Sequence, residues 1–87
     1  MFMIRFESVN VHTNKSNGSV VIDPTINFCF SQVRRSGFLK TTYEYHIVYN
    51  KAVDCWHGDV IDADGWRDLD FDEVDKIVKD KNLKELI

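Results

Sequence analysis

The sequence predicts an α+β fold, a four-stranded antiparallel β-meander with one face covered by a C-terminal α-helix. Three observations carry this prediction. Residues 1–61 alternate apolar and polar side chains with period two, as half-buried strands do. Turn residues interrupt this alternation, and residues 70–82 change to helical spacing. At 87 residues, the chain has the length of a single domain.

Three turns divide the predicted strands. Asn17-Gly18 favours a two-residue type I′ hairpin, because both central residues of that turn need positive φ. A four-residue loop is predicted at 34–37, and a two-residue turn at 50–51. These turns set the expected cross-strand pairs Phe28–Tyr43, Ile26–Tyr45 and Tyr45–Trp56.

The first strand changes the parity of its apolar positions between Phe6 and Val9. A parity change within one strand indicates a β-bulge, here near residues 7–8. Beyond the bulge, the expected pairs are Phe6–Phe28 and Ile4–Phe30, which places the even residues of this strand in the core.

The helix is predicted to begin after Asp70, whose side chain is suited to cap it, with Glu73 three residues later as in a capping box. Its apolar face is expected to cover the sheet with Phe71, Val74, Ile77 and Val78. Leu83, Leu86 and Ile87 fall on the other side of the helical wheel. We therefore expect an acidic turn at 62–69, a helix at 70–82 and a separately packed tail at 83–87, all within one domain 1–87.

Targeting and crosslinking signals are not evident. The apolar start of the chain meets Arg5 and Glu7 at once, which argues against a secretory segment, and no apolar run approaches the roughly 20 residues that span a bilayer. Two cysteines, Cys29 and Cys55, are too few for a disulfide framework. We expect a cytoplasmic protein that does not enter a membrane.

Charge is distributed unevenly. Residues 1–52 carry six basic and three acidic side chains, whereas residues 53–87 carry five basic and eleven acidic ones. Within residues 54–75, nine carboxylates accompany a single Arg67. Such a segment concentrates negative potential, which attracts a basic partner.

This acidic segment predicts a partner-binding surface made of Asp59, Asp62, Asp64, Trp66, Asp68 and Asp72. An exposed Trp is a common anchor of protein interfaces. The expected function is a small protein-binding module of the inhibitor or immunity type, as in toxin neutralisers or phage proteins that block host defence. It would block a basic, nucleic-acid-binding surface of a partner protein. The same residues also fit a solvated turn followed by an ordinary helix start, with Trp66 capping the sheet.

The alternative function is a small hydrolase or nuclease that uses Glu44, His46 and His57 on the other sheet face. The predicted register sets Glu44 opposite His57, His46 opposite Cys55 and Cys29 opposite Thr42. A polar sheet face, open to solvent or partly covered by a partner, is the simpler explanation of these residues. The Asp62-Ala63-Asp64-Gly65 run resembles a calcium loop only in part, because Val60 and Phe71 occupy its first and last ligand positions. No metal or other cofactor is predicted.

Two further interactions were weighed from the sequence. Arg34, Arg35 and Lys40 form a basic hairpin tip, but three cations on a chain of pI about 5.5 argue against nucleic-acid binding. An open meander also leaves its first and fourth strands as edges, either of which could pair in a homodimer.

Overall fold

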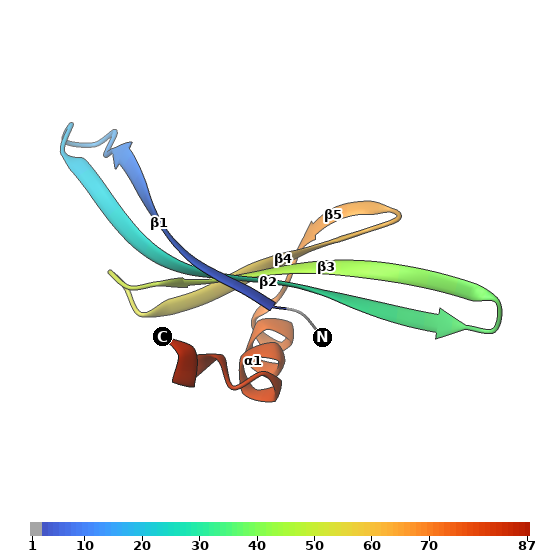
Figure 1. Ribbon diagram of the computed structural model, residues 1–87. Coiled ribbons are helices and arrows are strands. Elements are labelled where there is room, and N and C mark those ends of the chain that lie inside the picture. The colour runs from blue at the N-terminus through green and yellow to red at the C-terminus, as the bar shows by residue number, and fades with distance from the viewer. Residues whose placement is uncertain (1–2) are drawn as a thin grey trace.

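The chain folds as an antiparallel sheet of five strands in the order β1-β2-β3-β4-β5, with two helical segments on one face (Figure 1). The computed structural model describes residues 3–87. The strands are β1 Met3–Thr13, β2 Val20–Ser36, β3 Leu39–Asn50, β4 Cys55–Asp62 and β5 Gly65–Asp68. The α-helix α1 spans Phe71–Asp80, and the short 3₁₀ helix η1 spans Leu83–Leu86. The predicted α+β meander is therefore confirmed, with five strands instead of four.

The additional strand, β5, lies within the segment expected to be an acidic turn. The reversal is confined to Ala63 and Asp64, because Asp62 pairs with Gly65 and its Oδ1 accepts a hydrogen bond from the Asp64 N–H at 2.8 Å. After β5, the Leu69 N–H donates to the Gly58 carbonyl at 2.9 Å. Together these bonds cover the outer edge of β4 from Gly58 to Asp62 before the helix begins.

The second and third hairpins have registers that differ from the predicted ones by four residues. The β2–β3 turn contains only Gly37 and Phe38, so Phe28 faces Ile47 and not Tyr43. The β3–β4 turn is longer than expected, so Tyr45 faces Val60 and not Trp56. Because side chains alternate with period two, a shift of four leaves every residue on its predicted face.

The first hairpin corrects two predictions. β1 and β2 pair without interruption from Met3–Phe30 to Thr13–Val20, so the predicted bulge is absent. Phe6 therefore faces Asn27, and Ile4 faces Cys29, which places both on the face away from the helix. The turn is also wider than a two-residue type I′ turn, because the ladder closes with the Asn14 N–H donating to the Ser19 carbonyl at 2.7 Å.

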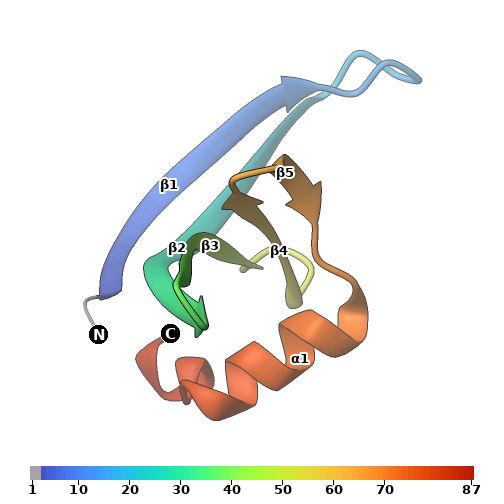
Figure 2. The same cartoon turned by 90° about the vertical axis from the view of Figure 1, so that its right-hand side faces the viewer.

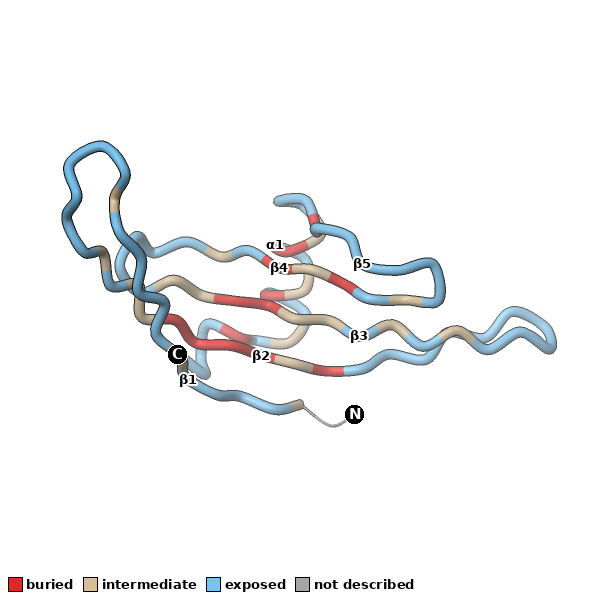
Figure 3. Tube along the Cα trace, turned by 90° about the horizontal axis from the view of Figure 1, so that it is seen from above, coloured by how far each residue is buried: buried red, intermediate tan, exposed pale blue. Residues whose placement is uncertain are grey.

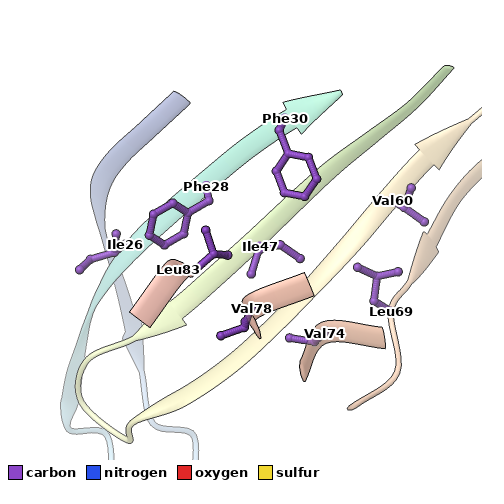
Figure 4. Packing of buried hydrophobic residues seen from close by; sticks show 9 residues of the cluster. All are labelled: Ile26, Phe28, Phe30, Ile47, Val60, Leu69, Val74, Val78 and Leu83. Carbon is purple, nitrogen blue, oxygen red and sulfur yellow. The ribbon is translucent and has the colours of Figure 1, made fainter. Parts of the chain in front are cut away.

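The helix begins as predicted, with Asp70 accepting a hydrogen bond from the Glu73 N–H at 2.8 Å. Its apolar face is narrower than expected, because Phe71 is 86% exposed. Asn82 adopts a left-handed conformation (φ 52°) that turns the chain, and η1 then places Leu83 against the sheet. Figure 4 shows how this core closes with Ile26, Phe28, Phe30, Ile47, Val60, Leu69, Val74, Val78 and Leu83.

The molecule is elongated, because the core occupies only the middle of the sheet. Its extents are 55 × 29 × 22 Å, and its radius of gyration is 15.3 Å, against about 12 Å for a compact chain of this length. Buried positions lie in the central parts of β2, β3 and β4, while the ends of the β1–β2 and β2–β3 hairpins project as exposed arms (Figure 3). Neither helical segment in residues 3–87 is long and apolar enough to cross a membrane.

A bidentate ion pair between Arg67 and Glu73 links β5 to α1. Arg67 donates to both carboxylate oxygens of Glu73, at 3.2 and 3.0 Å. The hydrogen bond from Arg67 is the main cause that lowers the pKa of the Glu73 carboxyl from its usual 4.5. This link orients the β4–β5 hairpin relative to the layer below it.

Leu83 and Leu86 provide a matched test of how η1 stabilises the fold, because one is fully buried and the other is 44% exposed. We expect Leu83→Ala to lower the free energy of unfolding by about 3 kcal/mol, since it opens a cavity under the sheet. Leu86→Ala should cost less than about 1 kcal/mol. Urea unfolding monitored by tryptophan fluorescence measures both, and equal losses would contradict this account of the core.

The Arg67–Glu73 pair also predicts part of the acid sensitivity. A carboxyl whose pKa is lower in the folded chain stabilises the fold above its unfolded pKa, and this contribution is lost as the pH falls from about 4.5 through the lowered value. Glu73→Gln should therefore flatten the decline of the urea midpoint between neutral and acidic pH. Asp72→Asn, in the same helical turn, is the control, and identical pH profiles for Glu73→Gln and wild type would refute the prediction.

Candidate functional site

In the described part of the chain no helix covers the sheet face opposite α1 (Figure 2), although Asn27 and Val48 on this face are buried. Residues directly opposite each other in an antiparallel ladder share a face, so the registers define its composition. One row crosses all five strands and contains Ile4, Cys29, His46, Asp59 and Asp68. The flanking rows contain Phe6, Asn27, Val48 and His57 on one side, and Ser31, Glu44, Ile61 and Trp66 on the other. We call these thirteen residues the open face.

A shallow hollow of about 380 Å³ lies in the middle of the open face. Aliphatic side chains stand at its two sides, Ile4 on β1 and Ile61 on β4, and Cys29, Glu44 and His46 lie between them. The hollow is therefore apolar at its rims and carries titratable groups across its floor.

His46 is held in place by its neighbours on three sides. Its Nε2 lies 3.0 Å from Asn27 Oδ1. The Asn27 amide nitrogen Nδ2 donates to Ser8 Oγ at 2.9 Å, which fixes the orientation of the amide. Oδ1 therefore points at His46 and accepts a hydrogen bond from the Nε2–H. Nδ1 lies 3.7 Å from Asp59 Oδ2, and the ring of Phe6 stacks on the imidazole with an interplanar angle of 7°. This network fixes the ring and commits Nε2 to Asn27.

Cys29 lies beside His46 in the same row, which brings a thiol, an imidazole and the Asp59 carboxylate onto neighbouring strands. The pKa of the Cys29 thiol is raised, first by burial and second by the charge of Asp59. A raised pKa keeps the thiol protonated and therefore weakly nucleophilic. The raised pKa therefore favours the thiol over the thiolate, which is the form that nucleophilic catalysis uses. Within residues 3–87, no three His, Cys, Asp or Glu side chains are grouped to hold a metal ion.

The pairs predicted for a hydrolytic site are wrong in detail. His46 faces Cys29 on one side and Asp59 on the other, and not Cys55. Glu44 faces Ser31 and Ile61. Because the β3–β4 register differs from the predicted one by four residues, the β4 partners of Glu44 and His46 lie four positions further along β4 than expected.

Glu44 and His57 do share the open face with His46, but the register does not bring them together. His57 faces Val48, four residues along β3 from Glu44. That offset corresponds to about 13 Å along a strand. Thr42 faces Val33 and not Cys29, and Cys55 faces Asn50 at the end of β4. Glu44 and His46 both line the hollow, whereas His57 lies outside it, so the three predicted catalytic residues do not form one cluster.

The six predicted partner-binding residues fall into three groups. Asp59, Trp66 and Asp68 lie on the open face. Asp62 and Asp64 lie at the tip of the β4–β5 hairpin, where Asp62 caps the turn. Asp72 is in the first turn of α1, in the layer on the other side of the sheet.

Two cross-strand pairs make the β4–β5 end of the open face distinctive. Ile61 and Trp66 face each other and remain 46% and 60% exposed. Asp59 and Asp68 also face each other, and like charges in direct cross-strand positions destabilise a sheet. Glu44 adds a third carboxylate beside Ile61. An exposed apolar pair thus lies within a cluster of carboxylates.

Sequence reasoning missed Ile61, Ile4 and Phe6 as members of this surface. The even parity of Ile4 and Phe6 was visible, but the inferred bulge assigned them to the core. Ile61 is two residues from Asp59 on β4 and therefore on the same face. This spacing is the signal that could have placed Ile61 beside the acidic residues.

Comparisons with known proteins give no match: no family model fits the chain, and neither a curated protein nor a solved structure resembles it significantly.

The two cysteines should differ in reactivity, because Cys55 is exposed whereas Cys29 is half-buried with a raised pKa. With limiting iodoacetamide at about pH 8, where an ordinary thiol is partly ionised, we expect the first adduct on Cys55. Peptide mass mapping locates it, and Cys55→Ser and Cys29→Ser isolate the two rates. Faster alkylation of Cys29 would reveal an activated thiol and overturn the argument against nucleophilic catalysis.

Proposed function

We propose that this protein is a small protein-binding module that occupies a basic surface of a partner protein, and that it acts as an inhibitor by blocking nucleic acid from that surface. The binding region is the β4–β5 end of the open face. The observation that carries the proposal is the pairing of an exposed Ile61–Trp66 contact with the facing carboxylates Asp59 and Asp68.

The apolar pair supplies the anchor of the proposed interface. Trp is enriched among the residues that dominate binding energy, and such residues need surroundings that exclude water once the partner docks. Ile61 supports the indole from the adjacent strand. Both lie on paired strands of the sheet, so little conformational entropy is lost when they are buried against a partner.

The carboxylates supply the preference for a basic partner. Repulsion between Asp59 and Asp68 costs the free protein stability, and a Lys or Arg placed between them relieves this cost. On the open face, the imidazole of His46 lies beside these carboxylates, with Nδ1 3.7 Å from Asp59 Oδ2. Arg35 and Lys40 lie on the same side of the sheet in the described part of the chain, but at the far tip of the β2–β3 arm and away from these carboxylates.

Nucleic acid is a poorer candidate partner. The basic arm carries three cations, and one of them, Arg34, lies over the ring of Tyr43 at 4.9 Å. The chain as a whole has a net charge of −3, which repels phosphate. An acidic module can instead compete with nucleic acid for the basic surface of a third protein.

Trp66→Ala should weaken binding at least about 30-fold, the loss expected for an anchor worth about 2 kcal/mol. The partner is captured from nuclease-treated lysate of the native host on the tagged chain, identified by mass spectrometry, and its affinity measured by calorimetry. Phe71→Ala is the control, because Phe71 is also an exposed aromatic residue (86%, against 60% for Trp66) but lies on the helix layer. If both variants bind the captured protein as wild type does, the proposed site is wrong.

The charge requirement is tested in the same assay with a charge-matched pair of double variants. Asp59→Asn with Asp68→Asn should lower affinity and reduce its salt dependence, whereas Asp72→Asn with Asp80→Asn, on the helix, should change neither. Inhibition is read as loss of nucleic-acid binding by the captured protein when the module is added. A captured protein that keeps its nucleic-acid affinity in the complex would contradict the inhibitor function.

A further inference from the structure

The sheet has one long unpaired edge, that of β1. This strand runs for 11 residues and, within residues 3–87, pairs only with β2; in Figure 2 no described segment lies along its outer side. The other candidate edge, β4, is covered from Gly58 to Asp62 by β5 and by the hydrogen bond from Leu69 to Gly58, which leaves only the three residues 55–57 without a strand partner on that side. The outermost strand on that side, β5, has only four residues. An edge as long as β1 exposes a row of backbone donors and acceptors that another strand can pair with.

The features that usually protect an edge are weak on β1. The strand contains no proline, and its ladder with β2 has no bulge within the described range. Its two permanently charged side chains carry opposite charges, contact their own chain and still keep 40% (Arg5) and 56% (Glu7) of their side-chain surface exposed. Arg5 Nε donates to the Leu86 carbonyl at 2.8 Å, and Glu7 Oε1 lies 3.3 Å from Arg5 Nη2 and 3.5 Å from Lys51 Nζ.

Both faces of β1 also expose apolar side chains. Ile4 and Phe6 are about half exposed on the open face, and Val9 and Val11 are more exposed on the face that α1 covers further along the sheet. A strand added to this edge shields apolar groups on both faces. Exposed apolar groups that line an unpaired edge mark it as an interaction surface.

We propose that β1 pairs with β1 of a second copy of this chain, antiparallel and about a two-fold axis at Phe6. In this register Arg5 faces Glu7 of the second copy, and Glu7 faces its Arg5. The remaining facing pairs are Phe6–Phe6, Ile4–Ser8 and Met3–Val9. The segment Met3–Val9 is thus complementary to itself in charge and in apolar character.

Neighbouring registers are worse. A two-fold axis at Arg5 or at Glu7 sets that charge directly against its own copy, which destabilises the pair. An axis at Ser8 places Arg5 opposite Val11 and Phe6 opposite Asn10, so that Arg5 no longer faces Glu7 of the second copy. The self-complementary pattern therefore selects the axis at Phe6, and it favours a second copy over an unrelated peptide.

The resulting dimer is one continuous sheet of ten strands. The two-fold axis is perpendicular to the sheet, so both helices lie on one side and both open faces on the other. Ser8 of the second copy stands beside Ile4, on the β1 side of the hollow, and extends its wall. Seven facing residues per strand give an interface at or below the roughly 1,200 Å² at which stable complexes begin, so the dimer should be reversible and micromolar. This inference is independent of the proposed inhibitor function.

Analytical ultracentrifugation of the full chain tests the association. From about 5 µM to about 500 µM, a range that brackets a micromolar Kd, the mass should rise from 10.2 kDa towards twice that value. Arg5→Glu should shift the midpoint to higher concentration at least about tenfold, since it faces Glu7 of the second copy with like charge. Adding Glu7→Arg to it should restore the association, and circular dichroism verifies the fold of each variant.

The axis itself is tested by crosslinking in a chain that carries Cys29→Ser and Cys55→Ser. Phe6→Cys should give a disulfide-linked dimer under mild oxidation, whereas Val33→Cys, exposed on the β2–β3 arm, should stay monomeric. A constant mass of one chain up to about 500 µM would overturn the proposal and leave the edge to another partner. Equal crosslinking of both variants, or association unaffected by Arg5→Glu, would overturn the register.

Discussion

The architecture depends on how little of the sheet the helix can cover. A helix of ten residues is about 15 Å long, whereas the 17 residues of β2 extend about 56 Å. Val74, Val78 and Leu83 therefore bury only the central residues of β2, β3 and β4. Everything beyond that patch, both hairpin arms and the entire second face, must remain folded through backbone pairing and local contacts. The elongated shape and the abundance of exposed apolar side chains both follow from this constraint.

The same constraint separates stability from function. The main core lies on one side of the sheet, and on the other side only a few residues, such as Asn27 and Val48, are buried. The exposed residues of that side can therefore be chosen for chemistry without weakening the core. The facing carboxylates Asp59 and Asp68 illustrate this freedom, because their repulsion is tolerated within a strand pair that Val60 anchors from below. Arg67, on the helix side of β5, adds to the same anchoring through Glu73. A costly arrangement on one face is thus supported by ordinary packing on the other.

The sequence predicts which face each residue of β2, β3 and β4 occupies, but it does not predict their partners. Apolar alternation has a period of two, so registers four residues apart satisfy it equally well. Only the turns distinguish such registers, and the turns predicted at 34–37 and 50–51 have the wrong lengths. The candidate catalytic pairs depended on partners and failed with them. The prediction of a partner-binding surface that includes Asp59, Trp66 and Asp68 rested on the acidic composition of residues 54–75 and did not depend on a register.

The errors at the two ends of the sheet have a different cause. A parity change in β1 was interpreted as a bulge because a core strand has one apolar face. β1 instead has apolar residues on both faces, since Ile4 and Phe6 lie over the open face while Val9 and Val11 lie along the arm. β5 was missed because its four exposed residues follow an Asp- and Gly-rich turn and show no apolar alternation. Because most side chains of the edge strands β1 and β5 are exposed, the apolar alternation that marks half-buried strands does not identify them.

The two proposed interactions occupy opposite ends of one rigid face and can therefore coexist. β1 and β5 are separated by four strand spacings, which corresponds to about 19 Å. A second copy at β1 leaves Trp66 and its carboxylates uncovered, and the two-fold axis repeats them on the same side of the sheet. Nine strand spacings, about 43 Å, then separate the two outer strands. A partner that presents two basic sites at such a separation, itself dimeric or repetitive, would be bound twice by one dimer. The second binding event would then be intramolecular, which strengthens association without any new contact.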